Sequence, residues 1–255
     1  MEKIILKGAK NVRDFSNTPT RDNRKVKPHL FLRGGDLSSL TKEDITILKA
    51  QYGLKTIIDL RTEAEIFENS DAQMSGVNRL HIPIFKQSTM GITLQAKQDI
   101  SSVLEKIPDM EQLYAMMVTD KRCIAALSEV FRNILNSSQG ALIWHCTEGK
   151  DRCGVVSALF LSMIGAGWND IVSDYMMTNE SSLKRANSYY AKVLLSTQDV
   201  KKAQKIKDLF LAREEYISAA FEAIRHENSS LEAFFAKKLG ISKKSIDEFK
   251  ERCLY

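Results

Sequence analysis

The 255-residue sequence has few cysteines, few prolines and no long apolar segment. The four cysteines form no Cys-x-x-Cys pair and the four histidines are scattered, so a zinc site is not expected and a reduced, cytoplasmic protein is favoured. With four prolines, no low-complexity tract and no internal repeat, no linker is evident, which predicts one domain over residues 1–255. No segment reaches the length needed to cross a bilayer, and the first residues lack the pattern of a secretory signal.

The charge balance is mildly basic. Lysine and arginine together number 37 against 32 aspartates and glutamates, a net charge of +5. This balance favours anionic partners such as phosphorylated groups or an acidic membrane surface. Nucleic acid is not expected as a partner, because no nucleic-acid motif is present and the aromatic residues are not interleaved with the basic ones.

Residues 144–154, Trp-His-Cys-Thr-Glu-Gly-Lys-Asp-Arg-Cys-Gly, carry the strongest signal for chemistry. They follow an apolar run at 141–144 that predicts a buried strand, and apolar residues at helical spacing follow from Val155. A loop that joins a strand to a helix can direct its backbone N–H groups and the positive end of the helix dipole toward one centre. The segment therefore predicts an anion-binding cradle.

Cys146 and Arg152 bracket this loop, six residues apart. The field of the cradle would lower the pKa of Cys146 and favour the thiolate, which is a nucleophile. Arg152 offers a planar charged fork that matches two phosphate oxygens and stabilises a transition state. A buried structural cysteine is the alternative, since Cys-x5-Arg also arises by chance, but the strand-to-helix context with Gly149 and Gly154 favours the cradle.

The motif His-Cys-x-x-Gly-Lys-Asp-Arg resembles the signature of the cysteine-dependent protein tyrosine phosphatase superfamily, in its bacterial and fungal branch of tyrosine and lipid phosphatases. Further stretches agree in family order along nearly the whole chain: 11–14, 32–38, 57–61, 174–180 and 212–216. The resemblance implies an α/β fold with a mostly parallel twisted sheet flanked by helices and a helical insert or lid around 181–213. The implied substrates are phosphotyrosine, with phosphoserine, phosphothreonine and phosphoinositides as further candidates. Secreted relatives in this branch keep a secreted protein as an alternative.

The resemblance also implies a mechanism without a metal or other cofactor. Cys146 attacks phosphorus to give a cysteinyl-phosphate, which water then hydrolyses. Asp151 is the first candidate for the general acid and Asp59 the second, with a structural salt bridge as the alternative for Asp151. Lys150 adds a second cation at the cradle. The predicted phosphate-binding residues are Thr147, Glu148, Gly149 and Lys150.

Three features leave alternatives open. Asp59 and Arg61 end a predicted strand, and either converge with Cys146 at the carboxyl edge of the sheet or form a structural ion pair. Cys153 replaces the usual Thr or Ser of the family, so it supports the thiolate more weakly, traps an oxidised Cys146 as a disulfide, or only fills space. Glu148 is expected to point outward and influence substrate choice, because a carboxylate facing the cradle would repel a phosphate dianion; the alternative is that this residue is incidental.

The helical second half adds a further alternative. From Lys184 to Arg213 the sequence has eight basic and two acidic residues, which predicts either a solvated helix face or a basic lid that attracts acidic lipids. Two functions of other classes also compete with a phosphatase. A catalytically weak module that binds phosphate or phosphoinositides would share the cradle without turnover. A thiol redox sensor would need Cys146 and Cys153 but not Arg152.

Overall fold

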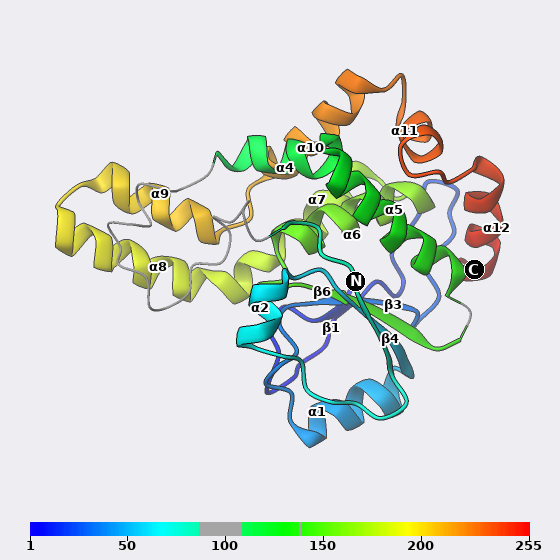
Figure 1. The fold of residues 1–255 in the computed structure, drawn as a ribbon, viewed down its shortest axis with the longest axis horizontal. Coiled ribbons are helices and arrows are strands. Elements are labelled where there is room, and N and C mark those ends of the chain that lie inside the picture. The colour runs from blue at the N-terminus through cyan, green and yellow to red at the C-terminus, as the bar shows by residue number, and fades with distance from the viewer. Residues whose placement is uncertain (87–108, 138) are drawn as a thin grey trace.

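The computed structural model describes residues 1–86, 109–137 and 139–255 (Figure 1). Its strands are β1 (Glu2–Lys3), β2 (Arg13–Asp14), β3 (Phe31–Gly34), β4 (Leu54–Asp59), β5 (Asn78–His81) and β6 (Ala141–His145). They form one sheet in the order β1-β2-β3-β6-β4-β5. Strands β3, β6, β4 and β5 are parallel, and β1 and β2 are antiparallel at one edge, so the predicted mostly parallel sheet is confirmed.

Helices cover both faces of this sheet, with the larger layer formed by the second half of the chain (Figure 1). The helices are α1 (Lys42–Thr46), α2 (Glu63–Glu68), α4 (Met110–Thr119), α5 (Lys121–Asn136), α6 (Asp151–Ile164), α7 (Trp168–Met176), α8 (Thr178–Thr197), α9 (Val200–Phe210), α10 (Glu214–Glu227), α11 (Leu231–Lys237) and α12 (Lys243–Cys253), with a π-helical segment η1 (Ile47–Gln51) after α1. Among the described residues, none of these helices is both long and apolar enough to span a membrane.

Strand β6 is buried throughout because it lies between β3 and β4 and is covered on both faces. Successive side chains of a strand point to opposite faces, so Trp144 enters the larger core while Ile143 enters the smaller core on the other face. His145 at the end of β6 is in register with Gly34 of β3 and Asp59 of β4. The loops that follow these three parallel strands therefore leave the sheet side by side.

The ends of several elements have local causes. Helix α1 begins after Thr41 through a capping box with Asp44, and the π-helical η1 follows it. Strand β5 ends at His81, shortly before Pro83, and lies at the sheet edge. Residues 87–108, which precede α4, lie outside the described residues.

Helices α8 and α9 form a hairpin that extends away from the sheet (Figure 1, yellow). They pack on each other around a separate cluster of apolar side chains: Ala186, Val193, Ala203, Ile206 and Phe210. The turn between them places Gln198 in the left-handed region, with φ of 53°. This hairpin occupies the place of the insert predicted around 181–213 and is called the α8–α9 hairpin below.

Candidate active site

Residues 146–150 form the loop that joins β6 to α6. Helix α6 begins at Asp151, and its N-cap residue Lys150 makes no side-chain cap, which leaves the N–H groups of the first turn to other acceptors. Gly149 has φ of +64°, and a Cβ there would lie 2.7 Å from the carbonyl carbon of Gly34. Only glycine fits this tight turn.

The carbonyl groups of the loop are bound on its outer side. The carbonyl of residue 147 accepts a hydrogen bond from the Asp36 N–H at 3.0 Å. Asn11 Nδ2 donates to the carbonyls of 148 and 149 at 3.2 and 2.9 Å, and Arg33 Nη2 donates to that of 149 at 2.7 Å. With its carbonyls held outward, the loop leaves its peptide N–H groups free to face the centre, which is the arrangement that binds an anion.

A buried charge cluster holds Arg33 in place behind the loop. Asp174 of α7 accepts from Arg13 Nε at 2.8 Å and is also ion-paired with Arg33. Burial would raise the pKa of Asp174, but the charges of Arg33 and Arg13 lower it, so the carboxylate stays ionised. These residues come from three of the stretches that match the family pattern, 11–14, 32–38 and 174–180, and Arg33 contacts the loop backbone directly.

Glu65 is the functional neighbour that the sequence analysis missed. It forms a bidentate ion pair with Arg152, with Nη1 to Oε2 at 2.7 Å and Nη2 to Oε1 at 2.8 Å. The same carboxylate accepts the Thr62 N–H at 2.9 Å and so caps α2, and it also accepts the hydroxyl of Thr147. Burial would raise the pKa of Glu65, but Arg152 and Thr147 hold it well below its usual range. The sequence pattern that could have indicated Glu65 is the Thr-x-x-Glu capping signature of Thr62 and Glu65, which follows a strand.

Arg152 keeps one donor that the protein does not use. Its side chain is buried, yet Nε has no hydrogen-bond partner among the described residues. A buried donor without a partner costs free energy, so such a group in a concave site indicates a ligand acceptor. Together with the inward N–H groups of the loop, Arg152 Nε makes a site that fits a phosphate or similar oxyanion.

Cys146 lies at the floor of this cradle and is only 2% exposed. Burial raises the pKa of its thiol, but hydrogen bonds from the Cys153 side chain and backbone and the charge of Arg152 lower it to about 6. The pKa of Cys153 is raised by burial and by the neighbouring Cys146 thiolate, so Cys153 remains a thiol, and its proton is shared with the carbonyls of Gly34 at 3.5 Å and Trp144 at 3.9 Å. The disulfide between the two remains a prediction, since both cysteines are free here.

Asp151, the first residue of α6, carries a buried carboxylate beside the loop. Its Oδ1 accepts a hydrogen bond from the Tyr114 hydroxyl at 2.7 Å, and Tyr114 in turn contacts the Tyr175 hydroxyl at 2.5 Å. Lys150 Nζ lies 3.3 Å from the same oxygen. The structure thus gives Asp151 the salt bridge that was its structural alternative, and adds two tyrosines that sequence patterns did not indicate.

Lys150 and Glu148 connect the loop to the α8–α9 hairpin. Lys150 Nζ donates to the carbonyl of Leu209 at 2.5 Å and lies 3.4 Å from that of Leu211. The C-terminal carbonyls of α9 thus bind the ammonium group, and the role of Lys150 as a second cation at the cradle stays a prediction. Glu148 points outward, as expected, and pairs with Arg185 of α8.

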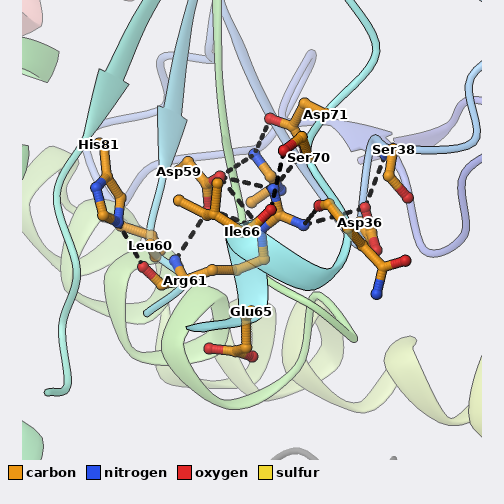
Figure 2. A network of polar contacts seen from close by, with 12 residues as sticks. Asp36, Ser38, Asp59, Leu60, Arg61, Glu65, Ile66, Ser70, Asp71 and His81 are labelled. Atoms are coloured by element: carbon orange, nitrogen blue, oxygen red, sulfur yellow. Dashed lines mark hydrogen bonds and ion pairs between the residues drawn. The ribbon is translucent and has the colours of Figure 1, made fainter. Parts of the chain in front are cut away.

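Asp59 and Arg61 form the structural ion pair that was one of their two alternatives (Figure 2). Arg61 Nε donates to Asp59 Oδ1 at 2.9 Å, and its Nη2 lies 2.7 Å from both Asp59 Oδ2 and Asp71 Oδ1. Nη1 reaches the Asn69 carbonyl at 2.8 Å and Asp36 at 3.2 Å. The network supports the loop through the Asp36 N–H, which donates to the carbonyl of residue 147.

One group of described residues has ligand atoms close enough for a metal ion. Oxygens of Asp59 and Asp71 and a nitrogen of His145 lie within 4.8 Å of one another. Two guanidinium groups already balance these carboxylates: Arg61 lies 2.7 Å from both, and Arg79 Nη2 lies 3.0 Å from Asp71. His145 Nε2 is 3.0 Å from Asp71 Oδ2, but the angle between the two groups is not that of a hydrogen bond. A cation placed here would face these arginines, and the residues therefore do not fit a metal site.

Curated relatives carry phosphatase names. A "Tyrosine-protein phosphatase" of Nostoc commune is 30% identical over 149 residues, 58% of this chain and 48% of that protein. A Cupriavidus necator relative is 24% identical over 172 residues, 67% of this chain and 60% of that protein. The match thus spans about half of the first relative and less than two thirds of the second. The "Triple specificity protein phosphatase PtpB" of Mycobacterium tuberculosis is 23% identical, covering 96% of each chain.

Solved structures give weaker similarity. The crystal structure of P. aeruginosa TpbA is 12% identical with a TM-score of 0.33, covering 77% of this chain and 90% of that one. PTPMT1 in complex with PI(5)P is 14% identical with a TM-score of 0.32, covering 78% and 92%. The sequence pattern of the "Tyrosine phosphatase family" matches residues 4–255. Because this match includes the loop, the Asp174 cluster and the strand ends around Asp59, the chain belongs to the tyrosine phosphatase family.

Proposed function

We propose that this protein is a phosphatase that hydrolyses phosphotyrosine monoesters through a cysteinyl-phosphate. The observation that carries the proposal is the pairing of two features in one cradle. One is the Cys146 thiol, whose pKa is lowered to about 6 and which is therefore largely a thiolate at neutral pH. The other is the buried Arg152 Nε, which has no partner among the described residues.

In the first step the Cys146 thiolate attacks phosphorus in line, the S–P bond forms and the ester P–O bond breaks. The leaving oxygen takes a proton, for which we propose Asp151, the carboxyl group next to the loop. In the second step water attacks phosphorus, gives a proton back to Asp151, and the S–P bond breaks to release phosphate and the thiolate. Arg152 Nε and the loop N–H groups stabilise the charge on the phosphoryl oxygens in both steps.

The proposal extends to phosphoserine, phosphothreonine and phosphoinositides as further substrates. Its support is the name of the M. tuberculosis relative, a triple specificity phosphatase that covers 96% of this chain. Phosphoproteins and phosphoinositides are accordingly the proposed partners, with an acidic membrane surface beside them. A reducing compartment such as the cytoplasm belongs to the proposal, because the chemistry needs a reduced Cys146.

The test is hydrolysis of an aryl phosphate in the presence of EDTA, with Cys253→Ser as the matched control for Cys146→Ser. Wild type and Cys253→Ser should turn over equally, and Cys146→Ser should lose at least about a thousandfold. Phosphate binding without turnover in wild type would instead favour a phosphate-binding module. Turnover that survives in Cys146→Ser would refute cysteine chemistry.

A further inference from the structure

The α8–α9 hairpin ends in a tip that exposes two large apolar side chains. Leu195 in the last turn of α8 is 84% exposed, and Val200 at the start of α9 is 60% exposed. The tip comprises residues 191–202. The apolar core of the hairpin is built from other residues, and the further exposed apolar residue of α8, Leu183 at 47%, lies at the opposite end of that helix from Leu195. Leu195 and Val200 are therefore not needed to hold the two helices together.

Lysines surround these two apolar side chains. Lys192, Lys201, Lys202 and Lys205 are all exposed, and Asp199 is the one acidic residue from 191 to 205, which gives this stretch a net charge of +3. Asp199 caps α9, since its Oδ1 accepts the Lys202 N–H at 3.0 Å, and its Oδ2 lies 3.9 Å from Lys202 Nζ. This one carboxylate leaves the stretch with an excess of positive charge, and apolar side chains beside such an excess match a surface that is apolar inside and anionic outside.

We propose that the hairpin tip docks the protein on a lipid surface that carries anionic head groups. Leu195 and Val200 insert at the boundary between head groups and acyl chains, and the lysines bind lipid phosphates and carboxylates. An acidic protein would match the lysines but offers no general counterpart to two apolar side chains at a projecting end. The lipid surface satisfies both chemistries, and it is the partner to which the proposal commits.

The exposed tip of the hairpin and the residues that contact the phosphate loop lie at opposite ends of the hairpin. The hairpin is attached to the phosphate loop at its other end, through Arg185 to Glu148 and through the Leu209 carbonyl to Lys150. Ten residues of α8 separate Arg185 from Leu195, about 15 Å at the rise of an α-helix. A docked tip therefore does not involve the residues that contact the loop, and it holds the loop close to the membrane. The biological meaning of this docking rests on the proposed function, but the binding itself does not.

The test is co-sedimentation of the full chain with vesicles of phosphatidylcholine alone or mixed with phosphatidylserine. Wild type should bind the mixed vesicles at least about tenfold more tightly than the neutral ones, and added salt should weaken this binding. Leu195→Ser combined with Val200→Ser, and Lys201→Glu combined with Lys202→Glu, should each lower binding about tenfold or more.

Two control variants alter equally exposed side chains far from the tip. Phe67→Ser changes an apolar residue of α2 that is 91% exposed, and Lys244→Glu changes an exposed lysine of α12. Both should bind like wild type. The docking proposal is overturned if wild type does not prefer mixed vesicles, or if the control variants weaken binding as much as the tip variants.

Measurements of turnover distinguish the docking proposal from the proposed function. Each tip variant should hydrolyse a soluble aryl phosphate at the wild-type rate, and Cys146→Ser should bind vesicles like wild type. If wild type binds vesicles but shows no turnover, the proposed phosphatase function is refuted and the docking proposal stands. If wild type shows turnover but does not bind vesicles, the docking proposal is refuted and the phosphatase function stands.

Discussion

Two buried arginines at the carboxyl edge of the sheet differ in whether all of their guanidinium nitrogens have an acceptor among the described residues. Arg61 follows β4 and Arg152 follows β6, and each forms a bidentate ion pair with a carboxylate. Every nitrogen of Arg61 has an acceptor within the protein. Arg152 Nε has none among the described residues.

This difference separates a structural cation from a functional one. The charge of Arg61 is used to join Asp59, Asp71 and Asp36, which fixes three chain segments beneath the loop. Glu65 uses only one edge of the Arg152 guanidinium and fixes its plane, so that the remaining donor is aimed before any ligand arrives. Four substitutions test this comparison.

The largest effect is expected at Arg152. Arg152→Lys keeps the positive charge but removes the planar fork and the unused Nε, so kcat/KM for an aryl phosphate should fall about a hundred- to thousandfold. Steady-state kinetics on folded enzyme measures this loss. A rate near that of wild type would mean that charge alone suffices and that the free donor has no special role.

Arg61→Met should act on stability instead of chemistry. Removing one partner of a buried ion-pair network leaves the aspartates uncompensated, which should lower the free energy of unfolding by about 3 to 5 kcal/mol. Urea denaturation measures this change, and kcat per folded molecule should stay within about threefold of wild type. An unchanged stability with a large loss of kcat would place Arg61 in the reaction.

Glu65→Gln should weaken the hold on Arg152 and change how stability depends on pH. The pKa of Glu65 is lowered in the folded protein, so its contribution is present above its unfolded pKa and is lost as the pH falls below about 4.5. At pH 7 the variant should be less stable by about 1 to 3 kcal/mol. Denaturation curves at pH 7 and in acid should show that the gap between the two proteins narrows in acid.

Cys153→Ala should alter the ionisation of Cys146 with little change in fold. Loss of the thiol donor disfavours the thiolate, so the pKa of Cys146, about 6 in wild type, should rise by about one unit. The pH dependence of inactivation by iodoacetamide reports this pKa directly. Cys153→Ser keeps a donor and should behave like wild type; an equal shift in both variants would exclude the hydrogen bond as the cause.

The same alanine variant tests the predicted disulfide. After peroxide treatment, thiol should restore activity to wild type, in which Cys153 can trap the oxidised Cys146, and should restore less to Cys153→Ala. Equal recovery in both proteins would remove the disulfide proposal and leave Cys153 as a hydrogen-bond donor.

The sequence predicted what depends on neighbouring residues. The order of strand, loop and helix around Cys146 follows from apolar spacing, and the glycine at 149 follows from the backbone freedom that a tight turn needs. The parallel sheet was predicted because the family resemblance extends along nearly the whole chain. The outward direction of Glu148 was also predicted, since repulsion by a bound dianion needs no knowledge of the fold.

Tertiary structure alone decided which charges meet. Lys150, predicted as a second cation at the cradle, binds the carbonyl of Leu209, 59 residues away in sequence. Glu65 holds Arg152 across 87 residues, and Asp71 completes the network around Arg61 through the fold of the segment after α2. A long charged side chain can reach several partners, and burial then selects the arrangement in which the most ionic groups are paired, a choice that depends on the whole packed molecule.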